Sequence, residues 1–272
     1  MYPVLFRLGS LTFQTYTVLL DVGLILTLAW LYVTAPRERA GVWLDAGLAA
    51  AVGALVGGRL GYTLANGSYY FGRIQEIFQI WTGGLSGPGA ALGGVMGLGI
   101  YCALRREPLG PLLDAAAWPL VGLSLLSWGG CMAAGCAYGA EVTPGQVPAW
   151  LTMNAPDLYG VWAERWSTQV FGLVWGVAAG VLLWLVARAS WRSGARGLYA
   201  LGVVALGALL ISFVRGDPDP GFSGNLRLDT AANALVLVVA VVGWAWLTRH
   251  RVKVAAGSAA AELPPQEEKT NG

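Results

Sequence analysis

The chain has 272 residues, of which 56% are hydrophobic and only 12% are charged, and its formal net charge is +2. A soluble domain is about a quarter charged, so this composition excludes an ordinary soluble protein and favours a helical protein with several membrane spans. Alternating strands of about ten residues, which mark an outer-membrane barrel, are absent from the sequence, and no nucleic-acid partner is expected.

Seven apolar runs are each long enough to cross a bilayer as a helix. They are expected at residues 13–33, 42–64, 85–104, 112–134, 168–187, 198–214 and 230–247. Residues 1–10 are not expected to belong to a cleaved signal peptide, because the apolar run that follows them is too long for a cleaved segment. The fold class is therefore all-α, with one integral-membrane domain over residues 1–250.

Four segments outside these runs have distinct characters. Residues 69–81 are too short and too mixed to span, and their aromatic residues indicate a helix in the membrane interface. Residues 135–167 form a long polar arm whose five tryptophan and tyrosine residues favour interfacial contact. Residues 216–227 are rich in turn formers, and the tail at 251–272 is expected to be disordered.

The basic residues predict the orientation of the spans. Ten lie near the span ends on one side, and six lie on the other, which includes the N-terminus and the arm. We therefore expect the N-terminus outside, the C-terminus in the cytoplasm and the arm external. The ten are Arg37, Arg39, Arg105, Arg106, Arg188, Arg192, Arg196, Arg249, Arg251 and Lys253.

Arg59 and Arg215 end two different spans on the expected outer side. A guanidinium grips a phosphate with paired donors, so the two arginines suggest a site for a lipid headgroup. The alternative for either residue alone is snorkelling at a helix end. The glycine-rich stretch at 57–94 favours the site, because glycines expose backbone amides and allow close approach.

Two polar residues lie in the first apolar run. Tyr16 is near its outer end, where a tyrosine is ordinarily an interfacial anchor. Asp21 lies deeper, and an acidic residue there is expected to face the bundle interior. Asp45 and Asp114 lie near the inner ends, where helix-end carboxylates facing water are expected.

The cysteines and the single histidine suggest no metal site and no cofactor. Cys102, Cys131 and Cys136 make no disulfide framework, and we interpret Cys131 and Cys136 as small packing residues. His250 lies in the inner tail, so histidine cannot be the base on the outer side.

The motifs in chain order resemble bacterial prolipoprotein diacylglyceryl transferase. They are GGRLGY from residue 57, WTGGLSGPGAALGG from residue 81, CAYG from residue 136, TQ at 168–169 and VRGDPD from residue 214. The resemblance covers about residues 8–249 and implies seven spans with the N-terminus outside. It also implies transfer of the diacylglyceryl group of phosphatidylglycerol to the lipobox cysteine of a preprolipoprotein, within the bacterial plasma membrane.

The resemblance assigns roles to individual positions. Arg215 and Tyr16 resemble catalytic residues of the family. The substrate-binding and lipid-binding positions that it implies are Arg59, Gly83, Gly84, Ser86, Gly89, Tyr138, Gly139 and Gln169. The implied partners are phosphatidylglycerol, the signal peptide of the preprolipoprotein and membrane lipids.

The chain departs from the family pattern at several positions. Pro88 stands where the family has a histidine, Trp128 where it has an arginine, and Cys131 where it has an asparagine. These departures favour a second hypothesis, a non-catalytic relative that binds phospholipid or a signal peptide. A small transporter is a third, suggested by Asp21, although no internal repeat supports it.

Overall fold

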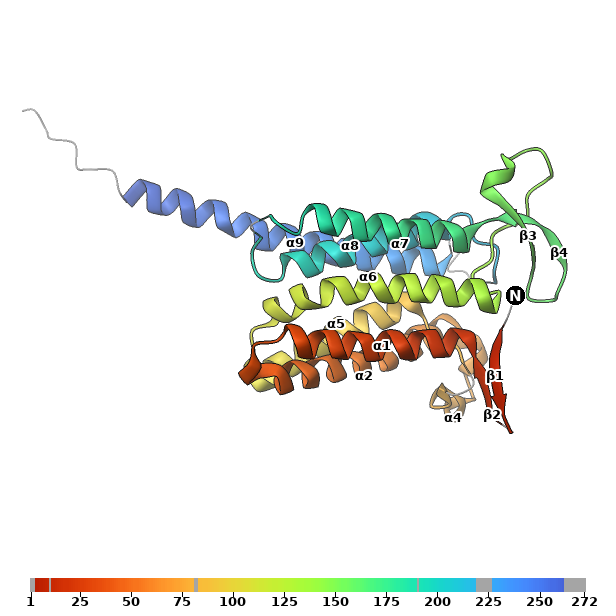
Figure 1. Ribbon diagram of the computed structural model, residues 1–272, viewed down its shortest axis with the longest axis horizontal. Helices are drawn as coiled ribbons and strands as arrows, with labels where there is room; N and C mark the ends of the chain where they lie inside the picture. Colours follow the sequence, from red (N-terminus) through yellow and green to blue (C-terminus); the bar gives the residue numbers. More distant parts are fainter. Residues whose placement is uncertain (1–2, 10, 81–82, 190, 219–226, 262–272) are drawn as a thin grey trace, which may run out of the picture.

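The computed structural model describes residues 3–9, 11–80, 83–189, 191–218 and 227–261, and its framework is a bundle of seven long helices. The seven are long and apolar enough to span a membrane, so the predicted polytopic helical fold is confirmed. Figure 1 shows them running roughly side by side. They are α1 (Thr15–Thr34), α2 (Ala40–Ala65), α5 (Gly87–Arg105), α6 (Leu109–Ala134), α7 (Thr168–Leu185), α8 (Ala195–Ser212) and α9 (Leu228–Ala261).

Short elements occupy the ends of the bundle. An unforeseen antiparallel hairpin, β1 (Val4–Leu8) with β2 (Leu11–Gln14), precedes α1. The expected arm contains a second hairpin, β3 (Thr152–Pro156) with β4 (Trp162–Trp166). Two one-turn 3₁₀ helices, η1 (Arg37–Arg39) and η3 (Ala149–Leu151), complete the connections.

The expectation of a single interfacial helix at residues 69–81 is wrong. The structure has two one-turn helices there, α3 (Gly67–Tyr70) and α4 (Ile74–Ile77). Gly72 lies between them with φ +86°, a left-handed conformation that interrupts a right-handed helix.

Helices α2 and α5 pack with their backbones in contact, because glycines line both sides of the seam. Gly53, Gly57 and Gly61 recur every fourth residue on α2, facing Gly89, Gly93 and Gly97 on α5. A Cβ built on Gly57 would lie 2.5 Å from the carbonyl oxygen of Gly89 and 2.6 Å from Cα of Gly93. Small residues at every fourth position allow such an approach in membranes, where dispersion contacts replace the hydrophobic effect.

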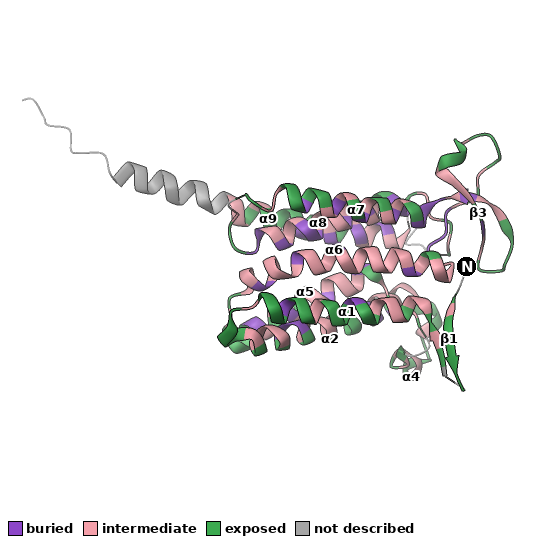
Figure 2. Cartoon of the chain, in the orientation of Figure 1, coloured by how far each residue is buried: buried purple, intermediate pink, exposed green. Residues whose placement is uncertain are grey.

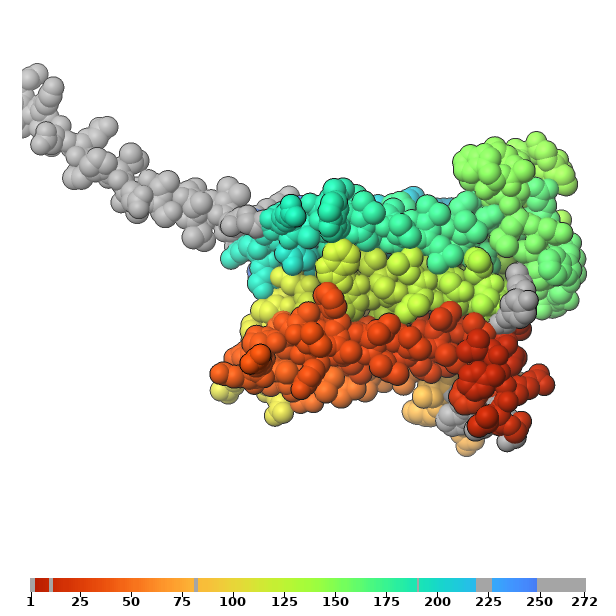
Figure 3. Space-filling model, viewed as in Figure 1, coloured from red at the N-terminus to blue at the C-terminus, as the bar shows by residue number. Residues whose placement is uncertain are grey.

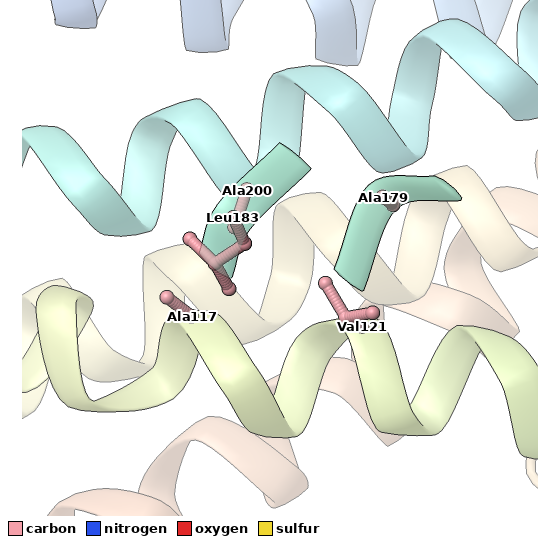
Figure 4. Close-up of a cluster of buried hydrophobic side chains, with 5 residues drawn as sticks. All are labelled: Ala117, Val121, Ala179, Leu183 and Ala200. Carbon is pink, nitrogen blue, oxygen red and sulfur yellow. The ribbon is translucent and has the colours of Figure 1, made fainter. Parts of the chain in front are cut away.

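The second half of the bundle consists of α6 to α9. Figure 4 shows one of its buried clusters, in which Ala117 and Val121 of α6 face Ala179 and Leu183 of α7 and Ala200 of α8. The outward faces of the helices carry exposed apolar side chains. Figure 2 colours the exposed residues green, and α1 and α7 both contain them. This pattern suits helices that are solvated by lipid.

Asp114 of α6 differs from the expectation of a water-facing carboxylate. It is half-buried and accepts hydrogen bonds from the backbone N–H groups of Gly194, Arg196 and Gly197, at 2.8, 2.9 and 3.2 Å. The first turn of a helix leaves such N–H groups without helical partners, so Asp114 caps α8 from a neighbouring helix.

Both hairpins, α4 and the start of α1 lie at one end of the bundle, on the right in Figures 1 and 3. The arm therefore shares a side with the N-terminus, as predicted, while which side faces the cytoplasm stays a prediction. Helix α9 continues to Ala261, and residues 262–272 lie outside the described part. The disorder expected for residues 251–272 stays a prediction.

Candidate functional site

Arg59 lies in the last turns of α2 with only 4% of its surface exposed. Its Nε donates to the carbonyl of Ile77 at 2.7 Å, Nη2 donates to that of Glu76, and Nη1 donates to those of Gly83 and Gly84. One guanidinium thus binds two separate parts of the connection between α2 and α5, namely residues 76–77 and residues 83–84. This arrangement is neither simple snorkelling nor an open phosphate fork.

The glycine-rich segment is shaped around the same arginine. Gly83 and Gly84 adopt φ values of +86° and +82°, which strain other residues, and they present their carbonyls to Arg59. Ser86 caps α5 by accepting from the N–H of Gly89 at 3.2 Å. A Cβ on Gly89 would lie 2.5 Å from the carbonyl oxygen of Gly57, so this glycine serves helix packing.

A second group of predicted residues meets where the arm joins the bundle. Gly139 pairs with Arg215 in an antiparallel bridge, and the N–H of Gly216 donates to the carbonyl of Tyr138 at 2.8 Å. The buried amide of Gln169 donates to the carbonyl of Cys136 at 2.9 Å. The predicted residues Tyr138, Gly139, Gln169 and Arg215 therefore form one connected group.

Arg215 is the charged centre of this group. Its Nε and Nη2 donate to both carboxylate oxygens of Asp217, and its Nη1 donates to Asp229 at 2.6 Å. Arg227 pairs with Asp217 from another direction at 3.3 Å. These two arginines and two aspartates carry no net charge together, and 21% of the Arg215 side chain remains exposed.

The two polar residues of α1 have different surroundings. Tyr16 packs on Gly130 of α6, where an added Cβ would lie 2.8 Å from ring atom Cδ2. Asp21 is exposed on the outer surface of α1, so the expectation that it faces the interior is wrong. It is therefore not placed to act as a base inside the bundle.

Cys131 and Cys136 form a disulfide, so their interpretation as unpaired packing residues is wrong. Gly135 ends α6 with φ +77°, and the N–H groups of Gly135 and Cys136 both donate to the carbonyl of Cys131. This left-handed C-cap turns the chain back on the helix and brings the two Cα atoms to 4.7 Å. Disulfides persist in oxidising compartments, which favours an external position for this end of the bundle.

The residues that replace the family histidine and arginine have packing roles. Pro88 is buried in the first turn of α5, a position that suits proline. The indole of Trp128 lies against Gly172 of α7, so closely that a side chain at Gly172 would collide with the ring. Neither replacement supplies a proton acceptor or a cation.

Sequence reasoning missed the role of Arg165, which it counted only as an external cation. Arg165 is buried, its guanidinium carbon lies 5.3 Å from the ring centre of Tyr138, and it pairs with Asp157 at 3.4 Å. An arginine within a short stretch bounded by Trp162 and Trp166 in the arm was the available signal. Arg165 supports Tyr138, and through it the Arg215 group.

Comparison with known proteins gives a consistent result. Residues 3–247 match the family model described as prolipoprotein diacylglyceryl transferase. Relatives named phosphatidylglycerol–prolipoprotein diacylglyceryl transferase include one from Parasynechococcus marenigrum, 25% identical over 92% of this chain and 95% of the relative. Another, from Verminephrobacter eiseniae, is 28% identical over 95% and 97%, and one from Geobacter sulfurreducens is 36% identical over 45% and 50%.

Proposed function

Because the chain belongs to the prolipoprotein diacylglyceryl transferase family, we propose that it transfers the diacylglyceryl group of phosphatidylglycerol to the lipobox cysteine of preprolipoproteins. The observation that carries the proposal is the extent of the family match, which includes all seven spans and both hairpins. The proposed location is the bacterial plasma membrane.

The chemistry is a displacement at carbon. The sulfur of the substrate thiolate forms a C–S bond with the glycerol carbon that carries the phosphate. The C–O bond to the phosphate breaks, and its electron pair leaves with glycerol phosphate. The nucleophile belongs to the substrate, so the protein has to orient two partners and stabilise the leaving phosphate.

Arg215 is the best candidate for stabilising the phosphate. Asp217 and Asp229 hold its guanidinium in one orientation, so little side-chain entropy remains to be lost on binding. A phosphate would approach over the exposed part of this side chain. Arg59, by contrast, is only 4% exposed and donates to backbone carbonyls rather than to carboxylates, so we propose that it positions the glycine-rich segment.

A second candidate function is phospholipid or signal-peptide binding without transfer. The packed positions of Pro88 and Trp128 favour it, because neither residue can accept the proton of the substrate thiol or add a second cation to Arg215 near the phosphate. Both functions use the same lipid and the same face of the protein.

Complementation separates the two. The gene is expressed in bacteria depleted of their own transferase, and the mass of a reporter lipoprotein is measured. A gain equal to one diacylglyceryl group, lost in Arg215→Ala and reduced in Arg215→Lys, supports transfer, because lysine keeps the charge but not the planar fork.

Unmodified reporter in the presence of membrane-inserted protein would refute the transferase proposal. The variant that combines Pro88→His with Trp128→Arg tests whether these two replacements are the cause of absent transfer. Transfer gained only in that variant would favour a non-catalytic relative that has kept the fold.

A further inference from the structure

A pocket of about 390 Å³ opens beside Arg59, at the end of the bundle that carries both hairpins. It lies between the end of α2 and the short helices α3 and α4, next to the backbone of residues 83–84. Its side-chain walls consist of phenols, amides and one carboxylate, from Tyr62, Asn66, Tyr69, Tyr70, Glu76 and Gln79. The volume is typical of a small-ligand site.

The tyrosines do not form a cage for a cationic ligand. The guanidinium of Arg59 lies 6.0 and 5.6 Å from the ring centres of Tyr62 and Tyr70, and that of Arg73 lies 4.5 Å from the ring of Tyr69. The rings also contact each other edge to face, with centres 5.1 and 6.4 Å apart. Arginines thus already lie against these rings, and the rings leave no space between parallel faces for an ammonium group.

The lining does not suit a bare anion either. Arg59 directs its Nε and both Nη atoms to carbonyl oxygens, it is only 4% exposed, and it is not among the residues that line the pocket. Glu76 places a carboxylate in the wall itself. An anion bound here would meet that carboxylate without gaining a fork of donors.

A neutral ligand with several hydroxyl groups fits these constraints. The hydroxyl of Tyr69 donates to Oε2 of Glu76 at 3.0 Å, which orients the carboxylate and leaves Oε1 as an acceptor. Asn66 donates from Nδ2 to the carbonyl of Tyr62 at 2.9 Å, which leaves its side-chain oxygen as a second acceptor. Two acceptors beside phenol hydroxyls match a vicinal diol.

We propose that this pocket binds the terminal glycerol of a phosphatidylglycerol headgroup, with Glu76 accepting its hydroxyl hydrogens. The inference rests on the proposed function for the lipid, and it adds a place and a set of residues for the headgroup. The pocket lies beside the end of α2, which is long and apolar enough to span a membrane, and the end of such a helix is expected at the level of the lipid headgroups. The same chemistry would accept free glycerol phosphate.

The test is binding by the full chain in nanodiscs of phosphatidylcholine, with bound lipid counted by native mass spectrometry. Phosphatidylglycerol is compared with phosphatidic acid, which lacks the second glycerol, and with phosphatidylethanolamine, which carries an ammonium group instead. We expect phosphatidylglycerol to bind most tightly. Glu76→Gln and Tyr62→Phe should each lower that affinity about three- to tenfold, with phosphatidic acid unaffected. Glu38→Gln, an exposed acidic residue of η1, is the matched control and should keep the preference.

Equal binding of phosphatidic acid, tighter binding of phosphatidylethanolamine, or an unchanged preference in both Glu76→Gln and Tyr62→Phe would overturn the assignment. Soluble glycerol 1-phosphate distinguishes the two sources. If glycerol 1-phosphate at millimolar concentration displaces the lipid, the pocket binds the released headgroup. If it displaces no lipid while the preference for phosphatidylglycerol persists, the pocket binds the headgroup of the intact lipid. Binding is read without turnover, so a chain that binds through Glu76 but transfers nothing refutes the proposed function and keeps the pocket.

Discussion

A single methyl group placed at Gly93 tests the backbone contact between α2 and α5. In Gly93→Ala the new Cβ would lie 2.7 Å from Cα of Gly57 and 3.0 Å from its nitrogen, and it would also collide with the carbonyl of Gly53. Ordinary contacts of a Cβ begin at 3.4 Å. The two helices would therefore have to separate by at least about 0.7 Å to relieve the contact with Cα of Gly57, and by more to clear the carbonyl oxygen of Gly53.

Two opposing contributions determine how Gly93→Ala changes the free energy of unfolding. Overpacking of a tight interface costs about 1–3 kcal/mol. The higher helix propensity of alanine compared with glycine stabilises a helix by up to about 1 kcal/mol. Gly99→Ala on the same helix receives only the second part, because a Cβ there meets nothing within 4 Å. The difference between the two variants, about 1–3 kcal/mol, isolates the close approach.

The assay is reversible unfolding of the purified chain in mixed detergent, with both variants measured beside the wild type. Gly93→Ala should be less stable than Gly99→Ala, and Gly99→Ala should be at least as stable as the wild type. Equal stability of the two variants would refute the backbone contact between α2 and α5.

Three further outcomes are expected from other parts of the molecule. A topology reporter inserted at Asn154 should be external, and Cys131 and Cys136 should resist alkylation until a reductant is added; a cytoplasmic reporter would overturn the orientation. Arg59→Lys should expose the connection between α2 and α5 to protease, because an ammonium group cannot reach carbonyls on both sides; unchanged digestion would leave Arg59 without its structural role. Asp114→Ala should lower the free energy of unfolding by about 1–3 kcal/mol, since the start of α8 loses its acceptor, and unchanged stability would show that water caps the helix equally well.

The seven spans were predictable because bilayer thickness fixes their length and the apolar runs display it directly. The direction of a side chain within a span was not predictable in the same way. The first run is apolar on all sides, so its sequence gives no helical phase, and Asp21 was expected inside when it lies outside.

The candidate site was predictable as a set of residues and much less so as a set of contacts. Arg59 was found by its charge in an apolar context, but its partners are backbone carbonyls, which every sequence contains. The disulfide was missed because five residues within a continuous helix would keep two cysteines more than one turn apart. Gly135, a glycine that follows an apolar run, was the available signal for a C-cap that reverses the chain.

The carbonyl contacts of Arg59 change what its motif can tell about distant members of the family. If Arg59 positions the glycine-rich segment as proposed, a lineage that had abandoned catalysis would still be under selection to keep an arginine there. Presence of the GGR sequence in a genome would then indicate an intact scaffold and not a working enzyme. We therefore propose sorting paralogues in surveys of such genes by the positions equivalent to 88, 128 and 215, where the proposed chemistry would need its functional groups.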